Sequence, residues 1–415
     1  MSEGAWDETT ERQAVASFEL TALPPDYLDD PYPYYRALRR HAPVHRLADG
    51  SYLLTRYADV AAIYRDPRMS SDKRREFRPR FGDGPLYLHH TTSLVFNDPP
   101  LHTVVRKLLA PAFTPRALAA LRPSVQRIVD GMLDRCAERG GMDVIADYAA
   151  AIPVQLIGDM LGIPDADRGP LREWSLRILG ALEPAISSEQ LDAGNRAVAE
   201  FSAYLSDLIA ERRRRPREDD VLTALIAGSV DGRRLSDDEL QQNCIFLLNA
   251  GHETTTNLIG NAVDALLRFP EQQRRLRAEP GLIEPAVEEF LRFDSSNQLG
   301  NRRLIEDAEI GGVAMAAGTY IHLGIGAANR DPAQFPLPDS LDIARTPNRH
   351  LAFGGGIHAC AGMSLARMEG QVAIGRLLQR FPAFEQVGPV RRGGRARFRG
   401  FYEYPIALGG ETVSG

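Results

Sequence analysis

Ten residues at 353–362, FGGGIHACAG, combine four glycines with a histidine and a cysteine. The glycines leave the sulfur of Cys360 little side-chain cover, and the apolar spacing of the residues that follow predicts a helix. Because N–H groups at a helix start favour negative charge, we expect Cys360 to ionise readily. The segment therefore predicts a reactive or ligand-forming thiolate.

Two other kinds of site share parts of this pattern. A zinc peptidase needs His-Glu-x-x-His on one helical face, but in HETTT (252–256) Thr256 takes the place of the second histidine. A dinucleotide-binding loop needs a buried strand before G-x-G-x-x-A and a parallel strand after its helix. Gly354, Gly356 and Ala359 fit the spacing, but the preceding RHLAF is no continuous strand. The sequence disfavours both sites.

A cofactor ligand is the third interpretation of Cys360. A single thiolate without a C-x-x-C partner excludes zinc ribbons and iron–sulfur clusters. One thiolate is enough for haem iron, where it pushes electron density toward O–O cleavage. Cys136 and Cys244 lie in helical patterns and are expected in the core.

Several cations are placed where they would suit the two propionates of a haem. His102 and Arg106 are four residues apart and share a helical face, directly after the turn NDPP (97–100). Arg302 follows a break in the pattern, and His358 lies two residues before the cysteine. Taken singly, each is more simply a surface charge or a core histidine.

One long helix must carry further chemistry. SDDE at 236–239 forms a capping box, and the apolar pattern continues to Phe269, where Pro270 stops it. In its middle, NAGHETTTN (249–257) places a glycine, an acid and three threonines, which weaken a helix. Helix rules broken in mid-helix are expected at functional sites.

The rest of the chain predicts a mainly α protein with small β-sheets. Helical spacing occurs near 32–41, 56–65, 101–110, 115–138, 145–161, 191–214, 236–269 and 362–380. Strand patterns cover 51–55, 308–315, 319–325 and 402–408, and an ordered meander is expected over 330–350. We expect residues 1–20 to form a flexible N-terminal segment and residues 21–415 a single domain.

Composition excludes several partners and compartments. A net charge of −6 argues against nucleic acid, and the arginine-rich run at 211–219 is expected to be a solvated helix end. No stretch approaches about twenty uninterrupted apolar residues, so no membrane segment is expected. The polar, acidic start predicts no signal peptide, and three widely spaced cysteines favour a reducing compartment. We therefore expect a cytoplasmic protein.

Four motifs together resemble the cytochrome P450 family. FGGGIHACAG matches its haem-binding loop, Phe-Gly-x-Gly-x-His-x-Cys-x-Gly, at every defined position. AGHETT (250–255) resembles its oxygen-binding groove, EEFLR contains its Glu-x-x-Arg as Glu289 and Arg292, and NDPPLHTVVR resembles its propionate helix. The motifs occur in the family's order across roughly residues 20 to 410, and the chain is similar to the soluble bacterial class.

The resemblance implies a fold, a cofactor and a set of residue roles. The family fold is a triangular prism with a long central helix over haem b. Cys360 would be the axial ligand of the iron, Thr254 would hydrogen-bond dioxygen, and Glu253 would help to deliver protons. Glu289 and Arg292 would form a structural ion pair with Arg345 or Arg349. The remaining residues implied around the haem are His102, Arg106, Arg302, His358, Ala250, Gly251, Phe353, Gly354 and Gly362.

The resemblance also implies a monooxygenase that inserts one oxygen atom from O2 into a small hydrophobic substrate. Electrons would come from NAD(P)H through a reductase and a ferredoxin, and the protein would be a monomer. A haem-thiolate binding or sensor protein without turnover is the alternative, which the Glu253–Thr254 pair disfavours because binding alone needs no proton relay. The ferredoxin is expected to dock on a basic patch of Lys107, Arg116, Arg122, Arg349 and Arg367.

A family-like substrate pocket would draw on residues scattered through the chain. They are His90, Leu94, Phe246, Asn249, Asn297, Gln298, Leu299 and Phe401. Asn249 and Asn297 either hold an oxygen-bearing substrate or are buried amides satisfied by the backbone. A terpenoid, steroid, polyketide, fatty acid or aromatic compound would each suit such a pocket.

Overall fold

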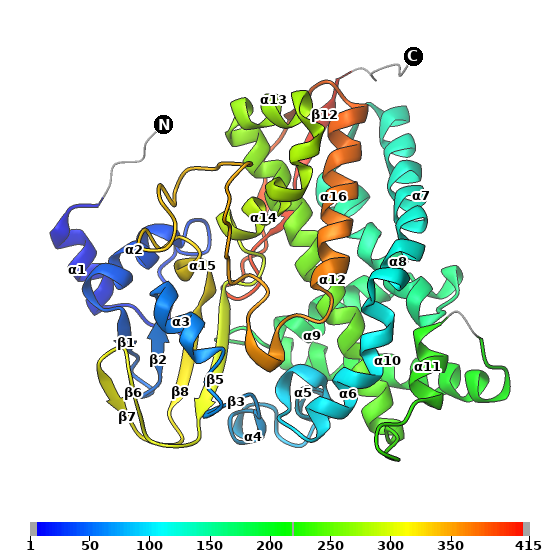
Figure 1. Ribbon diagram of the computed structural model, residues 1–415, viewed down its shortest axis with the longest axis horizontal. Coiled ribbons are helices and arrows are strands. Elements are labelled where there is room, and N and C mark those ends of the chain that lie inside the picture. The colour runs from blue at the N-terminus through cyan, green and yellow to red at the C-terminus, as the bar shows by residue number, and fades with distance from the viewer. Residues whose placement is uncertain (1–5, 218–219, 410–415) are drawn as a thin grey trace. The chain divides into compact units, whose positions relative to one another are not determined.

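Helices dominate the structure, and short strands gather into small sheets (Figure 1). The computed structural model describes residues 6–217 and 220–409. Two compact units divide the chain. Unit 1 contains Met1–Ser70, Asp264–Cys360 and Arg391–Phe401, and unit 2 contains Ser71–Val263, Ala361–Val390 and Tyr402–Gly415. The mainly α fold with small sheets that the sequence predicts is confirmed.

Unit 1 is built around a five-stranded sheet with the order β1-β2-β8-β5-β3. β8 lies parallel to β2 and antiparallel to β5, so two segments of the chain, residues 44–70 and 299–324, together form this sheet. The strands of unit 1 are β1 (Val44–Arg46), β2 (Tyr52–Leu54), β3 (Met69–Ser70), β5 (Leu299–Leu304), β6 (Ala308–Ile310), β7 (Val313–Met315), β8 (Tyr320–Gly324) and β10 (Arg391–Arg392). Its α-helices are α1 (Glu8–Ala16), α2 (Tyr32–His41), α3 (Tyr57–Ile63), α13 (Pro270–Ala278), α14 (Ile283–Phe293) and α15 (Ile325–Ala328).

The N-terminal segment of unit 1 differs from our expectation. Where we expected a flexible segment over 1–20, residues 8–16 form α1, which Asp7 caps by accepting the Thr10 N–H at 2.8 Å. The Trp6 ring meets the Tyr34 ring edge-on at 4.7 Å, and Phe18 is fully buried. Burial of Phe18 and the packing of the partly buried Trp6 fix the segment. Residues 1–5 lie outside the described part of the chain.

Unit 2 is mainly helical, and its longest helix is α12 (Asp237–Arg268), of which residues up to Val263 belong to this unit. The predicted capping box is present: Ser236 Oγ accepts the Glu239 N–H at 3.2 Å, and Glu239 Oε2 accepts the Ser236 N–H at 3.0 Å. The other α-helices are α4 (Arg74–Phe81), α5 (Pro85–Thr92), α6 (Leu101–Leu109), α7 (Pro115–Arg139), α8 (Ala151–Leu161), α9 (Leu171–Gly180), α10 (Ser188–Arg214), α11 (Val221–Ala227) and α16 (Met363–Arg380).

α16 follows the cysteine segment and runs beside α7 in unit 2 (Figure 1). Arg376 of α16 donates two hydrogen bonds, at 2.8 and 2.7 Å, to the carboxylate of Asp130 on α7. A three-stranded sheet completes the unit, with β12 (Pro405–Leu408) between β4 (Gly141–Asp143) and β9 (Phe384–Gln386). The strand expected over 402–408 is therefore divided into β11 (Phe401–Glu403) and β12.

Two other expectations are changed by the local backbone. The strand expected over 308–315 is a hairpin of β6 and β7, because Gly311 and Gly312 adopt positive φ angles and turn the chain. The helix expected over 145–161 is a π-helical turn, Val144–Ala149, followed by α8. The stretch Val144–Leu161 has the length and composition of a membrane span, but most of it is buried inside the structure, as in the core helix of a globular protein.

Candidate functional site

The cysteine loop of unit 1 is a closed turn. The Cys360 N–H donates to the Phe353 carbonyl at 2.9 Å, and the Ala359 N–H donates to the Gly356 carbonyl at 3.1 Å. Gly354 and Gly356 have φ angles of +65° and +64°, which only glycine adopts without strain. Within this turn Cys360 is half-buried and forms no disulfide. Residues 325–352, which the structure describes and which directly precede the loop, form no strand, in accord with rejecting the dinucleotide-binding pattern.

The other two cysteines have different surroundings. Cys136 and Cys244 are fully buried in helices. Burial raises the pKa of Cys136 and raises that of Cys244 to about 12, so both remain neutral thiols at physiological pH. Among the three cysteines, Cys360 is the one that is not fully buried.

Tyr64, which the sequence analysis did not single out, connects the cysteine loop to Arg302 within unit 1. A Cβ atom at Gly356 would lie 2.0 Å from the Tyr64 carbonyl oxygen, so the loop passes this backbone too closely for any side chain. The Arg302 guanidinium lies 5.3 Å from the centroid of the Tyr64 ring. Tyr64 thus supports both the glycines of the loop and the cation expected to meet a propionate.

The middle of α12 breaks the helix pattern as its sequence suggested. Thr254 is half-buried, and its Oγ1 donates to the Ala250 carbonyl at 2.7 Å, one turn earlier. With its proton committed to Ala250, Oγ1 presents lone pairs that accept hydrogen bonds. Glu253 is buried beside it, whereas Ala250 is exposed in a helix whose flanking residues are mostly buried.

Two small residues, Ala250 and Gly251, leave little side-chain bulk in this segment of α12. A Cβ atom at Gly251 would lie 3.0 Å from Ile157 Cδ1 on α8, at the limit of what the packing allows. Ala250 presents only a methyl group on the exposed side. Gly251 thus permits the close packing of α12 against α8. The role of Ala250 and Gly251 in leaving room for haem and dioxygen stays a prediction.

The predicted propionate residues of unit 2 lie on one helix. His102 and Arg106 occupy the same face of α6, where His102 is buried and Arg106 is half-buried. Lys107, the next residue, points to solvent, with 58% of its side chain exposed. In unit 1, His358 ends the short helix Gly356–His358 of the cysteine loop. A contact of these side chains with a haem propionate stays a prediction.

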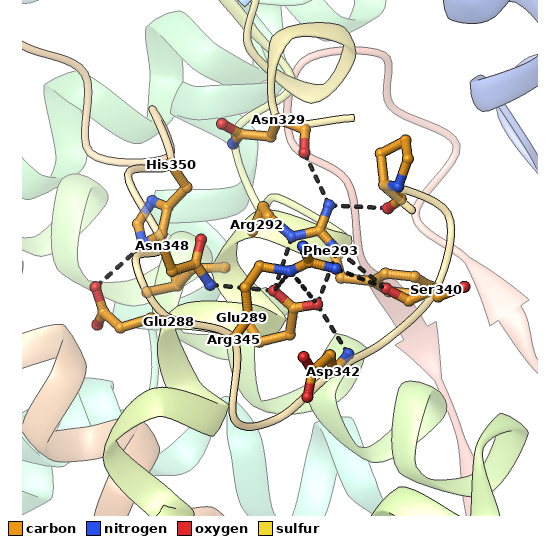
Figure 2. Close-up of polar contacts among 12 residues, drawn as sticks. Glu288, Glu289, Arg292, Phe293, Asn329, Ser340, Asp342, Arg345, Asn348 and His350 are labelled. Carbon is orange, nitrogen blue, oxygen red and sulfur yellow. Dashed lines mark hydrogen bonds and ion pairs between the residues drawn. The ribbon is translucent and has the colours of Figure 1, made fainter. Parts of the chain in front are cut away.

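The ion pair expected between Glu289 and Arg292 is present in unit 1, and both side chains are fully buried (Figure 2). Arg292 donates from Nε to Glu289 Oε2 at 2.7 Å and from Nη2 to Oε1 at 2.8 Å. Arg345 donates from Nε to both oxygens, at 3.2 and 3.1 Å, so Arg345 rather than Arg349 is the meander arginine of this pair. Arg349 instead accepts the Tyr57 hydroxyl at its carbonyl, at 2.6 Å.

This pair also ties the 330–350 meander to α14. Arg292 donates to the carbonyls of Asn329 at 2.9 Å, Pro338 at 2.8 Å and Ser340 at 3.2 Å. Glu289 Oε1 accepts the Asp342 N–H at 2.9 Å. The meander leads directly into the cysteine loop, so the role of the pair is structural, as the sequence suggested.

The pocket residues predicted in unit 2 lie on α5, on α12 and between them. His90 is buried among the rings of Phe77, Phe81 and Phe96, with centroids 5.4 to 5.6 Å away. Its neighbour His89 contacts Asn249 of α12 at 3.3 Å. Leu94 is buried and Phe246 is half-buried.

The pocket residues predicted in unit 1 make packing contacts and hydrogen bonds within that unit. Leu299 is fully buried in the hydrophobic core, and Gln298 Nε2 donates to the Ser295 carbonyl at 2.8 Å. A contact of these two side chains with a substrate stays a prediction. Asn297 forms an isolated β-bridge with Phe398, and Phe401 is buried with the Arg392 guanidinium 4.0 Å from its ring centroid.

Comparison with known proteins defines the family. The family profile described as Cytochrome P450 matches residues 181–390. The chain is 44% identical over 356 residues to the vitamin D(3) 25-hydroxylase of Pseudonocardia autotrophica, covering 85% of this chain and 86% of that protein. It is 39% identical over 372 residues to the cytochrome P450 monooxygenase PikC of Streptomyces venezuelae, covering 88% and 87%.

Solved structures give the same result. The structure titled P450BioI in complex with hexadec-9Z-enoic acid ligated acyl carrier protein matches with a TM-score of 0.88 and 36% identity, over 92% of this chain and 100% of that chain. The chain therefore belongs to the cytochrome P450 family and is a haem-thiolate monooxygenase that uses dioxygen. Its named relatives are hydroxylases and monooxygenases, which excludes the alternative of a sensor without turnover.

Proposed function

We propose that Cys360 supplies the thiolate that binds haem iron, and that the enzyme inserts one oxygen atom from O2 into a small hydrophobic molecule. The observation that supports the first part is the closed glycine turn, which holds the half-buried cysteine of the chain with its N–H bonded to the Phe353 carbonyl. Haem bound through a cysteine thiolate activates dioxygen for insertion of one oxygen atom into a substrate bond. His102, Arg106, Arg302 and His358 would neutralise its propionates.

We infer that α12 handles the protons of the reaction. Thr254 Oγ1 accepts a hydrogen bond from a protonated oxygen group, because its own proton is donated to the Ala250 carbonyl. Glu253 carries protons between solvent and that position. Such an acid–alcohol pair favours dioxygen activation driven by a reductase. We infer that electrons come from NAD(P)H through a reductase and a small acidic ferredoxin, and that the enzyme acts as a monomer in the cytoplasm.

The names of relatives guide the choice of substrates to test. One relative is a vitamin D(3) 25-hydroxylase, and structural neighbours are titled as complexes with a hexadecenoic acid on acyl carrier protein and with testosterone. Titration of the ferric protein with vitamin D3, testosterone and hexadecenoic acid would show binding as a shift of the haem absorption. Product analysis with a surrogate ferredoxin and reductase would then identify the position of oxygen insertion.

The iron ligand can be tested directly. Cys360→Ser should abolish the strongly red-shifted absorption of the reduced, carbon monoxide-bound protein, because serine supplies no thiolate. Cys136→Ser and Cys244→Ser are the matched controls and should retain this absorption. Loss of the absorption in either control, with retention in Cys360→Ser, would assign the ligand to a different cysteine.

A further inference from the structure

A chain of hydrogen bonds in unit 2 joins α12, α5 and α10. Gln242 and Asn249 are seven residues apart on α12 and therefore share one face of that helix. Both contact His89 of α5: Gln242 Oε1 lies 3.1 Å from His89 Nδ1, and Asn249 Nδ2 lies 3.3 Å from His89 Nε2. Gln242 Nε2 continues the chain by donating to Ser202 Oγ of α10 at 3.3 Å. One histidine thus connects two amides of the same helix.

The amide donors determine which atom donates in each hydrogen bond of this network. An amide nitrogen only donates, so Asn249 Nδ2 donates and His89 Nε2 accepts. The proton of the neutral imidazole is then on Nδ1, which donates to Gln242 Oε1. Burial lowers the pKa of His89 to about 4, so the ring is neutral at pH 7 and has the free Nε2 lone pair that this direction requires.

The chain leaves one strong acceptor unused. Asn249 is buried, with 2% of its surface exposed, and its Oδ1 has no hydrogen-bond partner among the described residues. A buried acceptor without a partner costs about 1–3 kcal/mol. With its proton on Nδ1, His89 has no donor for Oδ1 and holds the Nδ2 end of the amide instead.

A second asparagine of α12, Asn243, has a buried amide with a structural role, and all of its polar atoms are hydrogen-bonded. Asn243 is fully buried six residues earlier. Its Oδ1 accepts the Leu94 N–H at 2.9 Å, and its Nδ2 donates to the Glu239 carbonyl at 2.7 Å. Both ends of Asn243 are therefore bonded to the main chain, whereas Asn249 keeps its oxygen available.

The free oxygen belongs to the part of α12 that carries the chemistry. Asn249 directly precedes Ala250, whose carbonyl holds the Thr254 hydroxyl. Glu253 follows Asn249 by four residues, so the two share a helical face about 6 Å apart along the axis. A group bonded to Asn249 Oδ1 is therefore about one helical turn from the residues that handle oxygen and protons.

We propose that Asn249 Oδ1 accepts a hydrogen bond from a hydroxyl group of the substrate, and that His89 is a positioning residue that fixes this amide. The pair selects hydrophobic alcohols over the corresponding ethers and hydrocarbons, because only the alcohol supplies a donor. The proposal rests on the proposed function, since it assigns the part of the substrate that is held while another part reacts.

Alcohols and their methyl ethers test the proposal on the holoenzyme. The probes are vitamin D3, testosterone and hexadecanol, each with its O-methyl ether, and affinity is measured both by the haem absorption shift and by calorimetry. We expect at least one alcohol to bind about 10- to 100-fold more tightly than its ether. Asn249→Leu should reduce this ratio to about one and leave ether binding nearly unchanged.

Matched variants distinguish a loss of alcohol preference from a loss of folding stability. Asn243→Leu removes a buried amide from the same helix and should leave the alcohol-to-ether ratio unchanged while lowering the unfolding midpoint. His89→Leu should lower the ratio toward one although Asn249 is intact, because the amide is then free to rotate. A role of His89 in folding alone would lower stability without moving this ratio.

Three results would overturn the proposal. They are a wild-type protein that prefers no alcohol in the panel, a ratio that survives Asn249→Leu, and a His89 proton on Nε2. The last is measured by nitrogen-15 NMR of the wild-type ferrous–carbon monoxide protein, with His89→Leu assigning the signal, so it does not depend on folding of the Asn249 variant. Absence of the thiolate-type haem absorption would instead contradict the proposed function, while calorimetry would still test the alcohol preference.

Discussion

Replacement of Arg292 by alanine should destabilise unit 1 severely. Arg292 makes two hydrogen bonds to Glu289 and three to main-chain carbonyls, and both charged side chains are completely buried (Figure 2). Breaking a buried ion pair by removing one partner costs about 3–5 kcal/mol. Arg345 continues to compensate the Glu289 charge, so the orphaned carbonyls of Asn329 and Pro338, at about 1–3 kcal/mol each, make up much of that loss. The Ser340 carbonyl keeps a longer hydrogen bond from Arg345, at 3.5 Å.

This loss of free energy of unfolding leaves the variant only marginally stable. Proteins are stable by only about 5–15 kcal/mol, so a loss of 3–5 kcal/mol removes a third or more of it in the typical case. The carbonyls that lose the Arg292 hydrogen bond belong to Asn329, Pro338 and Ser340, in the meander that precedes the cysteine loop. We therefore expect Arg292→Ala to be recovered largely without haem or as aggregate.

The assay compares haem content and urea midpoints, by circular dichroism and haem absorption, with those of a surface variant. Arg376 binds Asp130 with the same two-bond geometry, but nearly half of its side chain is exposed. Arg376→Ala should therefore cost only about 0–1 kcal/mol. Arg292→Lys, which keeps the charge but loses the planar fork, should fall between them. Soluble Arg292→Ala with full haem content and the midpoint of Arg376→Ala would refute this reasoning.

Three further variants test other parts of the enzyme. Thr254→Ala should leave substrate affinity near normal but divert electrons to hydrogen peroxide, and an unchanged product yield per reductant would contradict its role. Charge reversal at Lys107, Arg116 and Arg367 should slow ferredoxin-dependent reduction without altering the haem spectrum, and reduction at the wild-type rate and independent of salt would place the donor elsewhere. Burial raises the pKa of Glu369 to about 8, so the folded protein binds more protons than the unfolded chain between pH 4.5 and 8 and loses stability as the pH rises through that range. Glu369→Gln should therefore stabilise the protein at pH 8 by on the order of 2–4 kcal/mol more than at pH 5 in urea unfolding, and equal effects at both pH values would show that the carboxyl is not held neutral.

Long elements with a regular apolar period were predictable from the sequence. α12 and α16 begin and end within a residue or two of the predicted bounds. The capping box at Ser236 and Glu239 and the proline at 270 mark the two ends of α12, and the apolar period of α16 marks its extent. α4 and α5 were missed. Their sequences, RREFRPRF and PLYLHHTT, have no clear apolar face, and contacts with the rest of unit 2 decide their conformation.

The same limit applies to individual site residues. Glu289 and Arg292 are three residues apart on one helix, so their pairing follows from local geometry. The choice between Arg345 and Arg349 does not follow from local geometry, because it depends on how the meander folds back over α14. His89 and His90 are adjacent on a short helix, where a rotation of about 100° separates them, and only the packing shows which one faces α12.

The sheet of unit 1 has a consequence for synthesis of the protein on the ribosome. β2 pairs with β8 through Tyr52 and Ile321, so a strand made early waits for one that follows some 270 residues later. At about 5–20 residues per second, roughly 15 to 50 seconds separate the two. During that interval Leu53 and Leu54, both fully buried in the finished protein, lack their cover. The early strand can therefore complete its part of the sheet only after translation has reached β8.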